Sequence, residues 1–258
     1  MVYLLLVVIC CVGLFGGMLL LLEVGRRIGI RRMEKDAEGA KAGVGAVVGA
    51  IFSLLGLLIA FTFSGASSRF DARVQLGIRE ANSIRTAYYL IELLPDPAKA
   101  SLKDNFRKYL DAELEVIKKL PDLGAAKEAL IRRSASQLEI ENEVVAAYSD
   151  PNIRAPASLL LSAISQWIDI SKTREFAANA HPPILIFAML MGLALVSSLI
   201  AGYGMAEVKS RSWLHIVTFA AVISIVIYVI IDLEFPRFGL IRLDAADRFL
   251  VDLRQTMK

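Results

Sequence analysis

The chain has 258 residues, of which 56% are hydrophobic and 21% are charged, and its formal net charge is +3. With a mean hydropathy of +0.55, this composition departs from that of a soluble domain, because a uniformly apolar core would not hold so many charges. The mild positive charge also argues against a nucleic-acid-binding protein, which would show a basic face with interleaved aromatic residues. The apolar residues must therefore be concentrated in blocks.

Four uncharged blocks of about 20 residues predict four transmembrane helices. They are residues 2–22, 43 to about 64, 183–203 and about 213–231. At a rise of ~1.5 Å per residue, ~20 helical residues span the ~30 Å hydrocarbon layer of a bilayer. Only helices satisfy their own backbone hydrogen bonds in lipid, and the blocks lack the alternation that the strands of a membrane barrel require.

The first block could instead be a cleaved signal peptide. Against this, no basic residue precedes it, a dense basic segment follows it, and a small-x-small cleavage site is lacking. We therefore expect a retained helix. Cys10 and Cys11 are adjacent inside this block, and we expect them to act as small hydrophobic residues.

Small residues recur every four positions in these blocks, which predicts that helices approach closely along one stripe. In the second block the stripe comprises Gly45, Gly49, Ser53, Gly56, Ala60 and Ser64, and in the third Ala194, Ser198 and Gly202. The opposite stripe of the second block comprises Ile51, Leu55, Ile59 and Phe63. This bulky stripe either packs against helices and lipid or lines a hydrophobic constriction in an oligomer, which can gate by dewetting.

Residues 65–182 are predicted to be helical throughout. After a turn at residues 95–97, the first helix has an apolar face with Leu102, Phe106, Leu110, Leu114 and Ile117. Pro121 ends this helix, and the next is expected to turn inward Leu130, Leu138, Val145 and Tyr148. A third helix, after Pro156, carries Leu160, Ile164, Trp167 and Ile168. These faces predict a small helical bundle.

The predicted fold class is therefore all-α: a polytopic membrane protein with four transmembrane helices and a helical extramembrane domain between the second and third. The expected divisions are residues 1–66, 67–182, 183–232 and 233–258. The last division contains a turn and then an amphipathic helix with Ala246, Phe249, Leu250 and Leu253. This helix could lie on the membrane surface or dock on the middle domain.

The sequence offers no catalytic set, so we expect no enzyme, no cofactor and no metal site. The two histidines, His181 and His215, lack metal-ligand spacing to a partner. The uncharged blocks also lack the intramembrane carboxylates that proton-coupled pumps use.

Charged residues gather just beyond the second block: Arg69, Asp71, Arg73, Arg79, Glu80 and Arg85. They either anchor the helix at the interface through local ion pairs, or form an electropositive vestibule in which Arg69 and Arg73 concentrate anions at a pore mouth. Asp232 and Glu234, at another helix end, are possible partners for these arginines.

Residues 52–73 resemble the second membrane helix of bacterial bestrophins and its charged exit. The segment Asp232-Leu-Glu-Phe-Pro-Arg-Phe-Gly is the most specific motif, with Asp232, Glu234, Pro236, Arg237 and Gly239 as its structural residues. Together with Glu80-Ala-Asn-Ser-Ile and His181-Pro-Pro, it is similar to the bacterial bestrophin-like domain family of unassigned function. The match spans most of the chain, whereas the link to true bestrophins rests mainly on residues 52–73.

The resemblance implies a multi-pass protein of the bacterial plasma membrane, and a ring-shaped homo-oligomer that conducts an inorganic anion along the second helix. It makes Ile51, Leu55, Ile59 and Phe63 candidates for the neck of the pore. The sequence departs from bestrophins in lacking the tryptophan pair after the first arginine and the acidic calcium clasp. A non-conducting membrane-anchored interaction or sensor protein is the rival hypothesis.

The side of the membrane on which the middle domain lies stays open. The loop between the first two blocks is basic, with Arg26, Arg27, Arg31, Arg32, Lys35 and Lys41, and Lys209 and Arg211 precede the fourth block. The positive-inside rule then places the middle domain outside the cell, whereas the resemblance places it inside.

Overall fold

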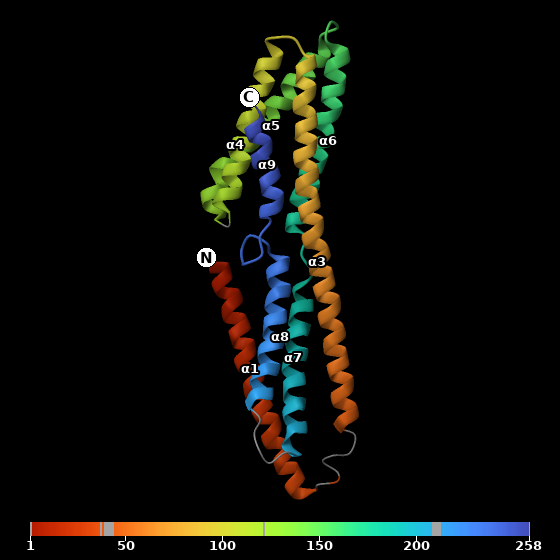
Figure 1. The fold of residues 1–258 in the computed structure, drawn as a ribbon, viewed down its shortest axis with the longest axis vertical. Coiled ribbons are helices and arrows are strands. Elements are labelled where there is room, and N and C mark those ends of the chain that lie inside the picture. Colours follow the sequence, from red (N-terminus) through yellow and green to blue (C-terminus); the bar gives the residue numbers. More distant parts are fainter. Residues whose placement is uncertain (1, 37, 39–43, 121, 208–212, 258) are drawn as a thin grey trace. The chain divides into compact units, whose positions relative to one another are not determined.

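The computed structural model is all-α: every regular element among the residues that it describes is a helix (Figure 1). It describes residues 2–36, 38, 44–120, 122–207 and 213–257. Lys41, Gly43, Pro121, Lys209 and Arg211 lie outside the described residues. The helices are α1 (Val2–Lys35), α3 (Val44–Leu90), α4 (Ala98–Lys119), α5 (Leu123–Ser149), α6 (Arg154–Asn179), α7 (Ile184–Gly204), α8 (Trp213–Glu234) and α9 (Asp244–Thr256).

Four helical stretches, containing α1, α3, α7 and α8, are long and apolar enough to cross a membrane. They coincide with the four uncharged blocks, so the predicted class of polytopic all-α membrane protein is confirmed. The prediction of a loop directly after the first block is wrong. Helix α1 continues beyond that block and includes Arg26, Arg27, Arg31 and Arg32. Arginine and lysine favour helices, and basic residues in the last turn complement the negative end of the helix dipole.

The chain divides into two compact units, and α3 contributes to both. Unit 1 comprises Met1–Ser68 and His181–Ile241, and unit 2 comprises Arg69–Ala180 and Arg242–Lys258. In unit 1 the core is formed by α1, α3, α7 and α8 and includes Leu14, Met18, Leu55, Leu190, Ala194, Ala220 and Ile227. These side chains are buried by helix packing inside the predicted membrane region.

Glycines let α1 and α7 pack backbone against backbone. A Cβ on Gly25 would stand 1.9 Å from the carbonyl oxygen of Leu199, and one on Gly202 would stand 2.0 Å from that of Leu22. The small-residue stripe predicted for the third block therefore packs against other helices of the same chain, since Ala194, Ser198 and Gly202 are all buried.

An aromatic cluster forms the centre of unit 2. The ring of Trp167 on α6 lies 5.4 Å from that of Phe106 and 4.7 Å from that of Tyr109, both on α4. The inward faces predicted for α4 and α6 are confirmed by buried Leu102, Phe106, Leu110, Leu160 and Ile164. Helix α6 begins at Arg154, so Pro156 lies in its first turn, where the missing N–H has no partner to lose.

The inward face predicted for α5 is wrong. Leu138, Val145 and Tyr148 are exposed, and Leu130 is only half-buried. The face that packs in unit 2 carries smaller residues instead: Ala126, Ala129, Ser136, Ile140, Val144 and Ala147. Hydrophobicity alone favoured the larger residues, but the smaller ones let α5 pack closely against its neighbours.

Helix α9 docks on unit 2, which selects one of the two predicted positions. Leu250, Leu253 and Met257 belong to the core of that unit. Arg254 donates two hydrogen bonds to the carboxylate of Asp111 on α4, from Nε at 2.8 Å and from Nη2 at 2.9 Å. Phe249, which was expected on the apolar face, is 46% exposed.

Candidate functional site

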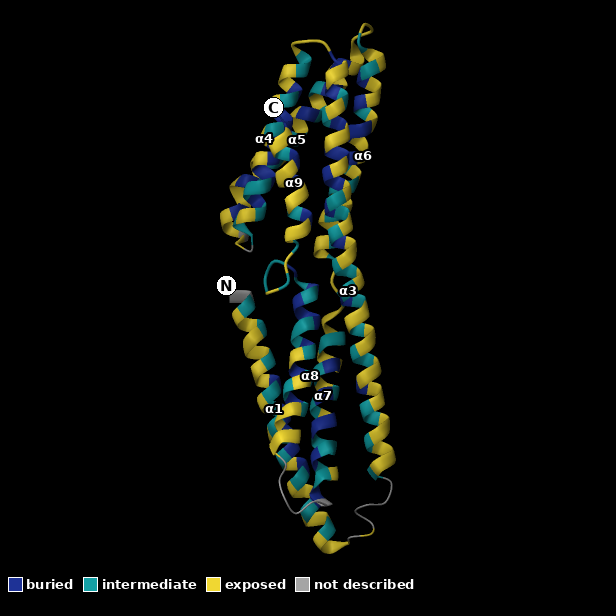
Figure 2. Cartoon of the chain, in the orientation of Figure 1, coloured by how far each residue is buried: buried dark blue, intermediate teal, exposed yellow. Residues whose placement is uncertain are grey.

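The apolar part of α3 is the least covered of the candidate membrane spans. In the most apolar 18-residue stretch of this helix only 6% of the residues are buried, compared with 17% in the corresponding stretch of α1 and 33% in that of α8. Figure 2 shows the same contrast, with mostly exposed and half-buried residues along this part of α3. This helix therefore leaves most of its surface available to lipid or to another molecule.

The bulky stripe predicted to line a pore is turned partly into the chain itself. Leu55 is 1% exposed and belongs to the core of unit 1, while Ile51 and Ile59 are half-buried. Phe63 is 44% exposed. A side chain that lines a pore between subunits is exposed in the single chain, so Leu55 is the least suited of the four predicted residues to that role.

The exposed surface of α3 has two sides of different chemistry. One side carries the small-residue stripe, and a Cβ on Gly45, Gly49 or Gly56 would meet nothing within 4 Å. The other side carries large apolar residues, namely Val47, Leu54, Leu57 and Phe61. A large apolar surface suits acyl chains, whereas a surface of glycine, alanine and serine suits close contact with another helix.

The two arginines of the predicted vestibule differ in their surroundings. Arg73 is 5% exposed, and its guanidinium donates to the carbonyl oxygens of Ala177 and Ala180, each at 3.0 Å. These carbonyl groups lie at the C-terminal end of α6, where backbone carbonyls have no partner within the helix and the helix dipole favours a cation. Arg69 is half-buried and lies one turn earlier on α3.

The motif at the end of α8 forms a turn that is held by Asp232. Its Oδ2 accepts hydrogen bonds from the backbone N–H of Leu240 at 3.0 Å and of Ile241 at 2.9 Å. A Cβ on Gly239 would stand 1.3 Å from Oδ1 of Asp232, so this position requires glycine. Arg237 has a φ of 99°, an uncommon conformation for a residue other than glycine. The turn therefore depends on specific residues.

A histidine–glutamate contact lies beside this turn. Nδ1 of His181 is 3.3 Å from Oε1 of Glu234, whose side chain is fully buried. The imidazole stacks on the ring of Phe235, with 4.3 Å between the ring centroids. The two segments of the predicted motif, at residues 181–183 and 232–241, are thus brought together within unit 1.

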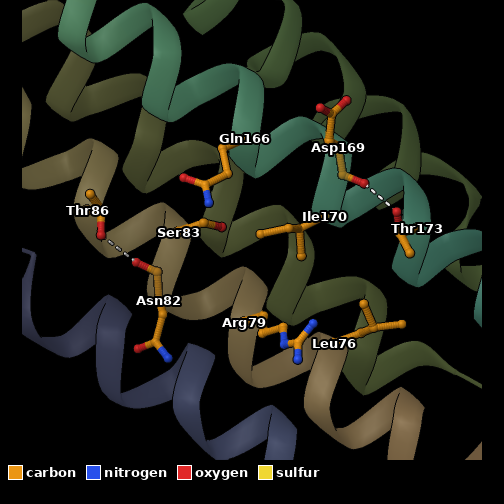
Figure 3. Close-up of a pocket in the computed structure, with 9 residues that line it drawn as sticks. All are labelled: Leu76, Arg79, Asn82, Ser83, Thr86, Gln166, Asp169, Ile170 and Thr173. Atoms are coloured by element: carbon orange, nitrogen blue, oxygen red, sulfur yellow. Dashed lines mark hydrogen bonds between the residues drawn. The ribbon is translucent and has the colours of Figure 1, made fainter.

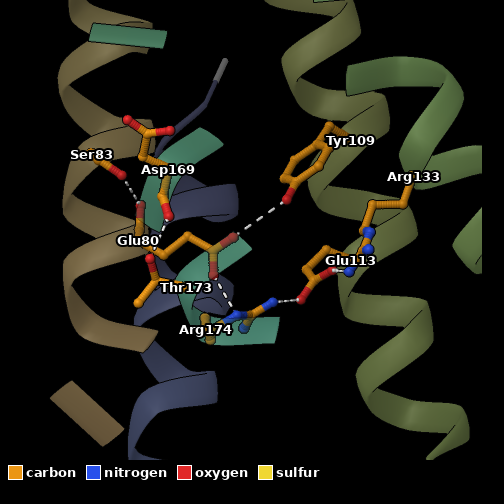
Figure 4. Close-up of polar contacts among 8 residues, drawn as sticks. All are labelled: Glu80, Ser83, Tyr109, Glu113, Arg133, Asp169, Thr173 and Arg174. Atoms are coloured by element: carbon orange, nitrogen blue, oxygen red, sulfur yellow. Dashed lines mark hydrogen bonds and ion pairs between the residues drawn. The ribbon is translucent and has the colours of Figure 1, made fainter. Parts of the chain in front are cut away.

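A buried ionic network joins four helices of unit 2, α3, α4, α5 and α6 (Figure 4). Arg174 on α6 pairs with Glu113 on α4 and, through Nε at 2.6 Å, with Oε2 of Glu80 on α3. Arg133 on α5 donates to Glu113 at 3.1 Å. The hydroxyl of Tyr109 lies 3.5 Å from Oε1 of Glu80.

The network keeps Glu113 ionised in spite of its burial. Burial by itself raises the pKa of this carboxyl, but the guanidiniums of Arg174 and Arg133 outweigh that effect and hold the pKa below its usual value. The same pairing raises the pKa of Arg133 against the effect of its own burial. Sequence reasoning noticed Glu80 but missed the other members. Glu113 could have been found, because it lies on the apolar face of α4, one turn after Leu110.

A polar hollow of about 550 Å³ lies between α3 and α6 in unit 2 (Figure 3). It is lined by Leu76, Arg79, Asn82, Ser83, Thr86, Gln166, Asp169, Ile170 and Thr173. The side chains of Arg79 and Gln166 make no hydrogen bond within the described part of the chain. No group of three or more His, Cys, Asp or Glu side chains in that part could hold a metal ion.

The sequence matches the family model described as "Bestrophin-like domain" over residues 12–245. The chain belongs to the bestrophin-like domain family. The resemblance that was predicted from residues 52–73 and from the motif at 232–241 is thus confirmed. A comparison with curated proteins found no match.

Solved structures show the same bestrophin fold. A variant of a bacterial bestrophin homologue from Klebsiella pneumoniae superimposes with a TM-score of 0.67 at 14% sequence identity, over 94% of this chain and 97% of that one. A second variant gives a TM-score of 0.66 at 15% identity, over 93% and 98%. A structure described as a membrane protein gives 0.60 at 16% identity, over 93% and 98%. At these identities the likeness establishes the fold of this bestrophin-like chain.

Proposed function

We propose that the chain assembles as a homo-oligomer in the bacterial plasma membrane and conducts an inorganic anion through a pore lined by α3. The observation that carries this proposal is the exposure of α3. A membrane helix with only 6% of its most apolar stretch buried in its own chain has a surface available for neighbouring subunits. Membership of a family with the bestrophin fold supports the same reading.

In this proposal the two exposed sides of α3 have different neighbours. The small-residue side faces the neighbouring subunit and the pore axis, and the side with Leu54, Leu57 and Phe61 faces lipid. Phe63 borders the small-residue side and is the leading pore-lining candidate. Ile59, one turn earlier on α3, is the second, and Ile51 lies farther round the helix from the small-residue side. A ring of such apolar side chains would form a constriction that opens and closes by wetting.

Arg69 and Arg73 supply positive charge where the apolar part of α3 ends. Arg73 already donates to the carbonyls of Ala177 and Ala180, so it would act through its charge rather than by binding the ion. Fixed cations at a pore mouth raise the local concentration of anions and their rate of entry by ~10-fold to 10³-fold.

Planar bilayer recording of the purified full chain under a chloride gradient tests the proposal. We expect a current that reverses near the chloride equilibrium potential, and Arg69→Glu should shift the reversal potential towards that of the cation. Phe63→Ala should change the conductance, whereas the matched variant Phe61→Ala, on the lipid side, should leave it unchanged. A folded oligomer that passes no current, or a cation-selective current, would overturn the proposal.

A second candidate function is a non-conducting interaction or sensor protein anchored in the membrane. The exposed apolar residues of α5, Ile131, Leu138 and Val145, favour this function, because a helix that faces only water rarely carries several large apolar residues on one side. Stoichiometry separates the two functions. A closed ring with α3 at its axis favours the pore, and a monomer or compact dimer favours the interaction protein.

A further inference from the structure

The C-terminal end of α1 carries a basic cluster that is exposed in its own chain. Residues 26–35 of this helix include one acidic residue, Glu34, and five basic ones, namely Arg26, Arg27, Arg31, Arg32 and Lys35. Arg31, Arg32 and Lys35 are exposed, and their side chains form no ion pair or hydrogen bond with the rest of the described chain. These three cations are therefore available to another molecule.

Interactions inside the chain explain only part of this cluster. Arg27 pairs with Glu23 one turn earlier, with 2.8 Å between Nε and Oε1. The negative end of the helix dipole favours cations in the last turn, which contains Arg32 and Lys35. The dipole gives no reason for Arg31, and it leaves the hydrogen-bond donors of all three exposed cations unused.

Contacts with α7 define the depth of the cluster in the membrane. A Cβ on Gly29 would stand 2.8 Å from the carbonyl oxygen of Tyr203, the last residue of the third uncharged block. The cluster therefore lies level with the end of the apolar part of α7 and just beyond it. Trp213 begins α8 at the same end of unit 1 (Figure 1) and is 59% exposed. Tyrosine and tryptophan favour the membrane interface, so the cations lie at the depth of the lipid headgroups.

The three exposed cations share one side of α1 with apolar residues. Val24 and Ile28 are 37% and 50% exposed. Arg31, Arg32 and Lys35 follow Ile28 at steps of three, one and three residues. This spacing places all five residues on one side of a helix. The side is apolar towards the membrane and cationic towards its surface.

The direction of the side chains brings the charge and the apolar surface together. Side chains in an α-helix lean towards its N-terminus, and the apolar block of α1 precedes the cluster. The three cations therefore lean back towards the membrane, over Ile28. Glu34 stands about 100° around the helix from the middle of this side, at ~100° per residue, so no carboxylate of α1 separates the cations.

We propose that this side of α1 binds an anionic phospholipid, whose phosphate lies among Arg31, Arg32 and Lys35 and whose acyl chains pack on Val24 and Ile28. Guanidinium and ammonium groups donate strong hydrogen bonds to phosphate oxygens. The cluster attracts a lipid with a net negative charge more strongly than a zwitterionic lipid, whose phosphate is balanced by its own cation. The inference rests on residence in a membrane and not on conduction, so an absence of anion current leaves it intact.

The affinity of the purified full chain for single lipids tests the proposal. Native mass spectrometry in detergent measures the lipid-bound fraction as phosphatidylglycerol or phosphatidylcholine is added. We expect wild type to bind phosphatidylglycerol more tightly than phosphatidylcholine. Arg31→Gln/Arg32→Gln should weaken the binding of phosphatidylglycerol about 30-fold, because each basic residue near an anionic lipid contributes about 5-fold. Arg31→Lys/Arg32→Lys, which keeps the charge, should retain most of the affinity.

Arg85→Gln/Lys127→Gln is the matched control, because it removes the same charge from two exposed residues of unit 2. Its affinity for phosphatidylglycerol should equal that of wild type. An equal loss in this control would show an effect of net charge and overturn the proposal. Equal wild-type affinities for the two lipids would overturn it as well. Displacement of phosphatidylglycerol by excess inorganic phosphate would show a site for free anions instead.

Fluorescence quenching in vesicles locates the lipid on the chain. Cys10 and Cys11 are the only cysteines, and both are first replaced by alanine before Val24→Cys is labelled with a fluorophore. Phosphatidylglycerol with brominated acyl chains should quench this position more than brominated phosphatidylcholine does at equal content. At Val12→Cys, which is 62% exposed and about three turns earlier on α1, the two lipids should quench equally.

Three outcomes of the quenching experiment would overturn the proposal. Equal quenching by the two lipids at residue 24 would show that the cluster selects no anionic lipid. The same preference for phosphatidylglycerol at residue 12 would show that the selection is not local. An absence of quenching at residue 24 by either lipid would show that protein, and not lipid, covers this side of α1.

Discussion

Gly25 on α1 lies against the backbone of Leu199 on α7, so closely that a Cβ at this glycine would stand 1.9 Å from the Leu199 carbonyl oxygen. This contact and its counterpart at Gly202 hold two predicted membrane helices together without side chains between them. In lipid, where apolar surface gains little from leaving the solvent, such close backbone packing is a main source of helix association. The stability of unit 1 should therefore depend on these glycines.

Gly25→Val should separate α1 from α7. We expect a loss of at least the ~1–3 kcal/mol that overpacking typically costs, measured as a lower midpoint of thermal unfolding in detergent. Gly13→Val is the matched control, because a Cβ at Gly13 meets nothing within 4 Å. Equal midpoints for the two variants would contradict the close contact.

Asp232→Ala should destabilise the turn at the end of α8. It removes the acceptor for two backbone N–H groups, and a hydrogen bond to a charged group contributes ~1.5–3 kcal/mol. Gly239→Ala should be more damaging alone than in the Asp232→Ala background, because the Cβ clashes with the Asp232 carboxylate. Chemical unfolding of the four proteins measures this coupling, and strictly additive losses would rule out the clash.

The ionised state of Glu113 should make unit 2 sensitive to acid. Since its pKa is lowered in the folded chain, Glu113 contributes stability above its ordinary pKa of about 4.5, and that contribution is lost as the pH falls through the folded value. Wild type should therefore melt well above Glu113→Gln near neutral pH, and the difference should shrink below pH ~4.5. Glu139→Gln, at an exposed and unpaired site, should not reproduce this effect. A difference that stays constant with pH would contradict the assignment.

Leu250→Ala should release α9 from unit 2. Leu250 is 1% exposed, and truncation of a buried leucine costs ~2–5 kcal/mol. Limited proteolysis should then cut within residues 242–258 faster than in wild type. Phe249→Ala, next to it but 46% exposed, should change stability by no more than ~0.5 kcal/mol. If both variants are cut at the wild-type rate, α9 does not depend on this contact.

The membrane helices and the family could be predicted from the sequence because both depend on local patterns. The preference of an uncharged block for lipid is a sum over ~20 consecutive residues and needs no knowledge of neighbours. The apolar faces of α4 and α6 were predicted correctly for a related reason, since each has one dominant hydrophobic stripe. The motif at residues 232–241 is likewise contiguous, and its glycine and proline indicated a turn.

Only the tertiary structure decided which face of a helix is used when two faces are apolar. On α5 the smaller face packs in unit 2 and the larger one is exposed, and on α3 Leu55 is buried while Phe63 is not. The ion pair between Arg174 and Glu113 joins residues 61 positions apart, and α9 reaches Asp111 through Arg254. Packing depends on the shape and charge of partners from distant segments, and a local hydrophobic pattern contains no information about those partners.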